Sequence, residues 1–144
     1  EDHGHEGLPV YKEPYWSPVS TPDIAVDYPF ILTSGGRSKN YQHSQGRKLE
    51  MLRAIEPYPV LQLSAQDAEV MDVKNDDWLR ASSPVGEIEI RALVCDVVMP
   101  GVVHIPHGWE DAPVNMLMPG EALCDITGFP GFKSSLCNVE KITK

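Results

Sequence analysis

A cluster of basic, hydroxyl and amide side chains occupies residues 33–48, TSGGRSKNYQHSQGRK, directly after the apolar run YPFIL. Adjacent glycines let backbone N–H groups approach an anion closely, and Arg37 offers a guanidinium that can bind an oxyanion through two hydrogen bonds. Four further hydrogen-bonding side chains follow in order: Tyr41, His43, Ser44 and Gln45. A helix expected over residues 44–55 would direct the N–H groups of its first turn to the same place. The segment predicts an anion-binding loop, with an ordinary polar surface loop as the alternative.

Two other histidines, His104 and His107, form an H-x-x-H pair in HIPHGW, a spacing that can chelate a metal ion. No carboxylate accompanies them at the spacing of a metalloenzyme motif, and His104 lies inside an apolar strand pattern. We therefore expect His104 to be a structural histidine with satisfied ring nitrogens, and we assign no metal ligands.

Motifs of nucleophilic catalysis and of common nucleotide sites are missing. The sequence has no G-x-S-x-G elbow, no Walker A loop and no G-x-G-x-x-G. It also has no Gly-Ser dipeptide, which argues against a pyruvoyl-type decarboxylase, because such small barrels cleave themselves at Gly-Ser. No catalytic residue is therefore assigned.

The composition fits one globular domain and limits its partners. The chain has 144 residues, 42% of them hydrophobic, and a formal net charge of −9. The acidic balance argues against nucleic acid, because phosphate neutralisation needs lysines and arginines over a whole face. No stretch approaches the roughly 18 apolar residues of a membrane span, so direct membrane insertion is not expected. Three cysteines without a C-x-x-C pair are interpreted as reduced, partly buried thiols: Cys95, Cys124 and Cys137.

Residues 1–27 are rich in Pro, Glu, His and Ser and predict an extended arm or linker without a core of its own. Within it, residues 1–7 are expected to be mobile because they offer no apolar anchor. The chain begins with Glu instead of Met, which suggests a piece of a longer protein. Residues 28–144 are expected to form the folded domain.

Short apolar segments between turn signals predict about six strands in a small barrel or sandwich. The clearest is GEIEIRALVC, in which apolar and charged residues alternate: Ile88, Ile90, Ala92 and Val94 against Glu87, Glu89 and Arg91. The other strands are expected within residues 28–33, 58–64, 74–83, 101–106 and 137–142. Two short helices are expected, one over 44–55 with Leu49, Leu52 and Ile55 on one face, and one over 64–73 with Ser64 and Asp67 as its cap.

From about Leu8 to Lys141 the chain resembles the C-terminal cofactor-binding domain of the molybdopterin oxidoreductases of the dimethyl-sulfoxide-reductase type. The resemblance rests on the order and spacing of TSGGR, YQHSQ, PVLQLSAQDAEV, MPGVVHIPHGW, VNMLM and GFPGFKSSLCNVEKI, together with the linker-like segment that precedes them. The chain departs from the family at KNDDWL, where Gly is common in the turn. Asn75 and Asp76 tolerate a positive φ, so we expect the turn to form.

The resemblance implies a mainly β fold, a double-psi β-barrel of about six strands with short helices. It implies the cofactor, bis-(molybdopterin guanine dinucleotide), a pair of dinucleotides that holds molybdenum or tungsten. This domain would close over both dinucleotides without supplying a metal ligand or turning over substrate alone. The implied partners are the remaining domains of the same polypeptide, with electron-transfer subunits as further candidates. The protein ligand of the metal, and any iron–sulfur cluster, would lie upstream.

The resemblance also implies ten cofactor-binding residues: Thr33, Gly35, Arg37, Tyr41, His43, Ser44, Gln45, Asn115, Phe132 and Lys133. Those of residues 33–37 match the loop that meets the phosphates and the pterin, and those of residues 41–45 match its continuation before the helix. Asn115 offers an amide that can both donate and accept at a pterin edge. Phe132 and Lys133 offer a flat face and a cation. The alternative is a free-standing β-barrel that acts as a protein-interaction module, which predicts an exposed apolar groove in place of polar, basic loops.

Overall fold

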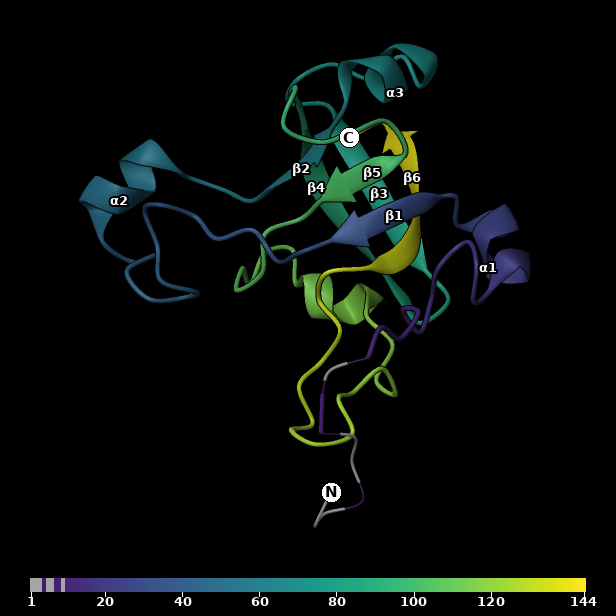
Figure 1. Cartoon of the computed structure of the whole chain (residues 1–144). Coiled ribbons are helices and arrows are strands. Elements are labelled where there is room, and N and C mark those ends of the chain that lie inside the picture. The colour runs from purple at the N-terminus through teal and green to yellow at the C-terminus, as the bar shows by residue number, and fades with distance from the viewer. Residues whose placement is uncertain (1–3, 5–6, 9) are drawn as a thin grey trace.

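Six strands close into a barrel in the computed structural model, which describes residue 4, residues 7–8 and residues 10–144 (Figure 1). The strands are β1 (Phe30–Thr33), β2 (Val60–Leu63), β3 (Trp78–Ser83), β4 (Gly86–Val94), β5 (Val102–His104) and β6 (Ser135–Ile142). Around the barrel their order is β1-β5-β2-β4-β3-β6. Each of the six strands expected from the sequence is therefore present.

Two strand pairs are parallel, β1 with β5 and β2 with β4, whereas the other four pairs are antiparallel. Parallel neighbours cannot be joined by a hairpin and need a long crossover connection, which is why β1 and β5, and β2 and β4, are adjacent in the barrel but not consecutive in sequence. The prediction of a mainly β, double-psi β-barrel with short helices is confirmed.

Alternation along β4 sets the inner and outer faces of the barrel. Ile88, Ile90 and Ala92 are buried, whereas Glu87 and Glu89 are exposed, as predicted. Arg91 and Val94 are half-buried, so Val94 packs at the margin of the core. Burial of one face of each strand fixes the register, because a slip by one residue would turn the apolar set to solvent.

Among the described residues, four short helices lie outside the barrel: α1 (Pro22–Asp27), α2 (Glu50–Ile55), α3 (Ala65–Val70) and the 3-10 helix η1 (Val114–Leu117). Ser64 caps α3 as predicted, since its Oγ accepts a hydrogen bond from the Asp67 backbone N–H at 3.0 Å. The Asp67 carboxylate in turn accepts from the Gly101 N–H at 2.9 Å, which ties α3 to the start of β5. None of the helices within the described residues is long and apolar enough to cross a membrane.

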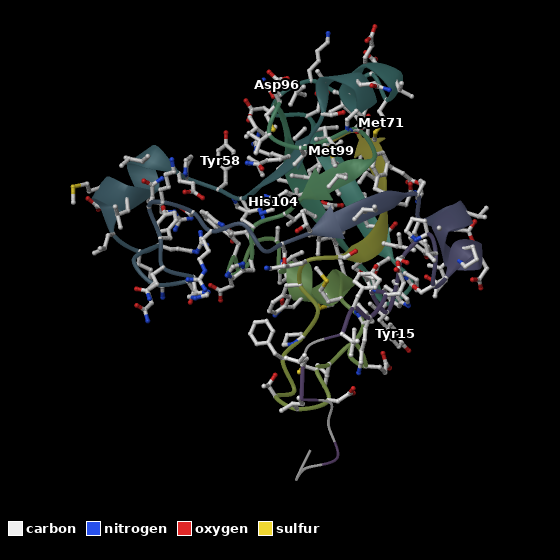
Figure 2. All side chains as sticks on the ribbon, viewed as in Figure 1. Tyr15, Tyr58, Met71, Asp96, Met99 and His104 are labelled. Atoms are coloured by element: carbon white, nitrogen blue, oxygen red, sulfur yellow. The ribbon has the colours of Figure 1, made fainter. Side chains whose placement is uncertain are left out.

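The helix expected over residues 44–55 is shorter than predicted and begins only at Glu50. Gly46 adopts a φ of +83°, which a right-handed helix cannot accommodate, so the preceding residues form turns. Leu49 and Ile55 are 57% and 63% exposed, because the excursion between β1 and β2 carries α2 away from the barrel (Figure 1). The Tyr58 hydroxyl, just before β2, donates a hydrogen bond to the Asp76 carboxylate at 2.9 Å (Figure 2). Asp76 itself has a φ of +69°, as the turn in KNDDWL requires.

The N-terminal segment contains more local structure than an extended arm. Residues 22–27 form α1, and Trp16 is only 7% exposed. The mobility expected of residues 1–7 falls mostly on residues outside the described part of the chain. The division into an arm and a barrel domain remains a proposal.

We expect Ile90→Ala to lower the free energy of unfolding by about 2–5 kcal/mol, because the side chain is 1% exposed in the core and its truncation leaves a cavity. Val70→Ala is the matched control. Val70 is 84% exposed on α3, and its truncation should stay within about 0.5 kcal/mol of the parent. Urea unfolding followed by circular dichroism measures both, and equal losses would contradict the barrel core.

The three cysteines should differ in reactivity. Burial raises the pKa of Cys137 to about 12, whereas hydrogen bonds from Thr127 lower the pKa of the exposed Cys124. The expectation of partly buried thiols was therefore wrong for Cys124. At pH 7.5 iodoacetamide should label Cys124 first and Cys137 only after unfolding, since the thiolate is the nucleophile. Mass spectrometry of tryptic peptides gives the order, which early labelling of Cys137 would contradict.

Candidate functional site

Three segments distant in sequence meet at one end of the barrel because of the register of β1. The parallel pairing with β5 sets Thr33 opposite His104, so the chains leaving β1 and β5 start side by side. The antiparallel pairing with β6 sets Leu32 opposite Ser135, so the chain entering β6 arrives at the same end. The Ser34 N–H accordingly donates to the Phe132 carbonyl at 2.9 Å.

Gly36 is packed directly on His104. A Cβ at Gly36 would lie 2.6 Å from His104 Nε2, so only glycine allows this close approach of the loop. Burial lowers the pKa of His104, which keeps the imidazole neutral beside the strands of the barrel (Figure 2). A backbone hydrogen bond with Gly36 acts against this lowering of the pKa, so the expectation of a structural, satisfied histidine stays a prediction.

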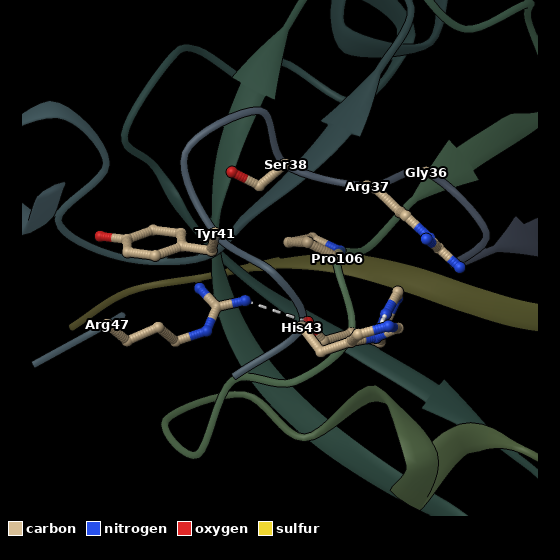
Figure 3. Close-up of a pocket in the computed structure, with 8 residues that line it drawn as sticks. Gly36, Arg37, Ser38, Tyr41, His43, Arg47 and Pro106 are labelled. Carbon is tan, nitrogen blue, oxygen red and sulfur yellow. Dashed lines mark hydrogen bonds between the residues drawn. The ribbon is translucent and has the colours of Figure 1, made fainter. Parts of the chain in front are cut away.

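Arg47 holds the excursion between β1 and β2 against the segment after β5 (Figure 3). Its guanidinium carbon lies 3.6 Å from the centre of the Trp109 ring and 4.6 Å from that of Tyr41, within the range of cation–π attraction. One terminal nitrogen donates to the His107 carbonyl at 3.2 Å, and Tyr41 donates to the Glu56 carbonyl at 2.8 Å. Burial lowers the pKa of Arg47, although a guanidinium remains charged.

His43 and His107 form a hydrogen-bonded pair between the same two segments. His43 Nδ1 lies 2.8 Å from His107 Nε2, and His107 Nδ1 lies 2.9 Å from the Ser34 carbonyl oxygen. The His107 ring stacks on Phe132 with an interplanar angle of 5° and a centroid distance of 6.3 Å. The pair therefore joins all three segments of the site.

The backbone around His43 is strained and tightly packed. His43 has a φ of +54°, a region that non-glycine residues rarely occupy. Gly108 has a φ of +79°, and a Cβ there would lie 3.1 Å from the His43 carbonyl carbon. Such strain persists only where the surrounding structure holds the residue in place.

A shallow, open pocket with a cavity volume of about 10 Å³ lies among these groups, lined by Gly36, Arg37, Ser38, Tyr41, His43, Arg47, Pro106 and His107. Arg37 is exposed and makes no ion pair within the described part of the chain. Lys133 is exposed beside Gly35, where a Cβ would lie 3.2 Å from Lys133 Cγ. The site thus presents two accessible cations, a histidine pair and aromatic faces.

The structure brings together seven of the ten residues predicted for the site: Thr33, Gly35, Arg37, Tyr41, His43, Phe132 and Lys133. Ser44 and Gln45 lie beside His43 in exposed turns and make no side-chain contact with the pocket among the described residues. Asn115 is exposed on η1, which packs against β3 and β4, and no recorded contact in the described chain joins it to the pocket. The predicted helix N-terminus is also lacking there, since α2 begins at Glu50.

Sequence reasoning did not assign three residues that build the site: Arg47, His107 and Trp109. The sequence signal for His107 and Trp109 was the segment HGW, which directly follows the strand expected over 101–106. Its glycine, Gly108, has a positive φ in the structure. Arg47 was indistinguishable from a solvated arginine, because its aromatic partners come from two separate segments.

A family model described as "Molydopterin dinucleotide binding domain" matches residues 30–136. Among curated proteins, the chain is 32% identical over 109 residues to an acetylene hydratase of Syntrophotalea acetylenica, covering 75% of the chain and 15% of that protein. It is 28% identical to an F420-dependent formate dehydrogenase subunit alpha of Methanocaldococcus jannaschii, covering 92% and 20%. It is 31% identical to an assimilatory nitrate reductase catalytic subunit of Bacillus subtilis, covering 81% and 16%.

Among solved structures, an acetylene hydratase from Pelobacter acetylenicus superimposes with a TM-score of 0.84 at 24% identity. The alignment covers 98% of the chain and 22% of that structure, which establishes the shared fold. The chain spans 15–20% of the length of the three curated relatives named above.

We expect Gly108→Ala to destabilise the chain more than Gly101→Ala. Both glycines have positive φ, which costs an alanine about 1–2 kcal/mol, but only a Cβ at Gly108 meets backbone atoms, those of His43 and Ser44. Urea unfolding of the two variants isolates the contact from the strain. Equal losses, with unchanged NMR resonances for His43 in the Gly108 variant, would contradict the packing described.

Proposed function

The chain belongs to the molybdopterin dinucleotide-binding domain family, and from this premise we propose that it is one domain of a longer molybdenum- or tungsten-dependent oxidoreductase. In this proposal it binds the molybdopterin guanine dinucleotide cofactor and turns over nothing by itself. The observation that carries the proposal is the convergence at one barrel end of two exposed cations, Arg37 and Lys133, with the close-packed glycines of the first loop.

The donor set at this end fits a ligand rich in oxygen acceptors. A pyrophosphate needs positive charge and accessible N–H groups, which Arg37, Lys133 and the backbone at Gly35 and Gly36 can supply. Nε and Nη1 of Arg47 and Nε1 of Trp109 are buried without an acceptor among the described residues. Unpaired buried donors are costly, and a ligand with several acceptors at this end would offset that cost.

The size of the pocket supports a shared site. Its cavity volume of about 10 Å³ is far below the roughly 300–1,000 Å³ typical of pockets for drug-sized ligands, so this chain alone can meet only part of a dinucleotide. We propose that the rest of the enclosing wall comes from the remaining domains of the same polypeptide, and that this chain alone binds the cofactor weakly. When bound, the cofactor would supply the metal and its redox chemistry, while this chain would hold its phosphates and ring systems.

The names of the relatives support a common cofactor instead of a common substrate. One is named for acetylene hydration, another for formate and a third for nitrate, yet all align with this chain. We infer that the substrate is selected elsewhere in the polypeptide, where the metal ligand, any iron–sulfur cluster and contacts with electron-transfer subunits would also lie.

The exposed apolar face of α2 supports a partner within the same polypeptide. Met51 and Ile55, four residues apart on α2, are 75% and 63% exposed. Because the chain spans 15–20% of its relatives, we propose that the remaining domains cover this face. A free-standing protein-interaction module would show an exposed apolar groove. Here the exposed apolar residues lie on a helix, and the pocket is polar and basic.

In the full-length enzyme, Arg37→Ala should lower the retention of cofactor, because a lost charged hydrogen bond costs about 1.5–3 kcal/mol, roughly 10–150-fold in affinity. Arg53→Ala is the matched control, since Arg53 is exposed in the last turn of α2. Metal content by mass spectrometry and pterin content by fluorescence after oxidation measure occupancy. Asn115→Ala tests the remaining predicted contact, and unchanged occupancy in the Arg37/Asn115 double variant would refute the proposal.

A further inference from the structure

The hydrogen bonds of the His43–His107 pair determine where its protons lie. A carbonyl oxygen can only accept, so the 2.9 Å contact with the Ser34 oxygen requires a proton on His107 Nδ1. A neutral imidazole carries one N–H and one lone pair, which leaves His107 Nε2 as an acceptor. The 2.8 Å contact with His43 therefore requires a proton on His43 Nδ1.

The opposite direction would make His107 a cation. His43 Nδ1 could accept only if both nitrogens of His107 carried protons, and Arg47, whose guanidinium binds the His107 carbonyl, already brings a positive charge to this residue. With both rings neutral, the chain of bonds runs from His43 through His107 to Ser34. The remaining nitrogen, His43 Nε2, is then a lone-pair acceptor on an exposed side chain that lines the pocket.

We propose that His107 is a positioning residue that holds His43 as its Nδ1–H tautomer, so that His43 Nε2 accepts a hydrogen bond from a ring N–H of the ligand. This inference rests on the proposed function and divides the site into two parts. Arg37 and Lys133 bind the anionic part of the ligand, whereas His43 binds a heterocycle by accepting a hydrogen bond from its ring N–H. A neutral imidazole acceptor repels a phosphate oxygen, which is also an acceptor, and matches an N–H donor.

The chemistry that fits this acceptor is a 2-aminopyrimidin-4-one edge, on which a ring N–H and an amino group lie side by side. Guanine and pterin share that edge, so both parts of the proposed cofactor are candidate sources. The nearby rings offer a flat surface for such a heterocycle, since His107 stacks on Phe132 and Phe129 contacts Phe132 edge-on at 5.7 Å.

The backbone conformation at His43 restricts where its imidazole ring can point. Its φ of +54° is unfavourable for a side chain of this size, and it is held by packing against Gly108. Packing therefore restricts the direction in which the His43 side chain leaves the backbone, with Nδ1 at His107 and the ring lining the pocket.

The tautomer can be measured without any ligand. Long-range ¹H–¹⁵N spectra of the ¹⁵N-labelled 144-residue chain at pH 8, where an imidazole is neutral, distinguish Nδ1–H from Nε2–H. We expect Nδ1–H for His43 in the parent chain and a shift toward Nε2–H in His107→Phe, which keeps the ring stack but lacks both hydrogen bonds. His107→Gln can still donate to Ser34 and accept from His43, so it should retain Nδ1–H. An Nε2–H tautomer in the parent, or one unaffected by His107→Phe, would overturn the assignment.

The ligand edge is tested by titrating the same labelled chain with guanosine, with pterin and with 1-methylinosine, which has no N–H on that edge. Guanosine or pterin should shift the His43 Nε2 resonance, and 1-methylinosine should not. A response to guanosine alone or to pterin alone identifies the source, whereas equal responses to all three, or none, would overturn the proposed edge. Because these probes carry no phosphate, their failure is separate from that of the cofactor retention measured on Arg37→Ala.

Discussion

The pairing of β1 with two neighbours is the constraint on which the rest of the structure depends. The short strand Phe30–Thr33 pairs in parallel with β5 and antiparallel with β6. That single register brings the loop after Thr33, the segment after His104 and the segment before Ser135 to the same barrel end. The pairing is maintained by the core, where Leu32, Val103 and Cys137 are fully buried. A slip of one residue would expose these side chains and separate the three segments.

The site is rigid where segments touch and open where a ligand could bind. Gly36 lies against the His104 side chain and Gly108 against the His43 backbone, and a Cβ at either glycine would be closer to these atoms than an ordinary contact. Arg47 stacks on Trp109 and donates a hydrogen bond to the His107 carbonyl, so this one cation links the excursion between β1 and β2 to the segment after β5. Arg37 and Lys133 remain exposed. A frame of this kind reduces the ordering cost of binding, because the groups that meet the ligand are positioned in advance.

Much of the fold was predictable from sequence, and much less of the site. The alternation of Ile88, Ile90 and Ala92 with Glu87 and Glu89 requires a half-buried strand, and the structure has one. The length of α2 was overestimated, because the periodicity of Leu49, Leu52 and Ile55 predicted a helix without showing that Gly46 would interrupt it. Leu49 and Ile55 remain largely exposed, so a periodic apolar pattern alone did not identify the surface that it packs against.

The sequence by itself determined the strands, the cap of α3 and the basic character of residues 33–48, because these depend on neighbours within a few residues. The family resemblance, carried by ordered motifs, was also readable in the chain. Only the tertiary structure decided that His43 lies against His107, that Arg47 stacks on Trp109 and that Phe132 reaches Ser34. These contacts join residues about 60 to 100 positions apart, and they follow from the closure of the barrel. Local sequence patterns do not specify which distant segments the closure of the barrel brings together.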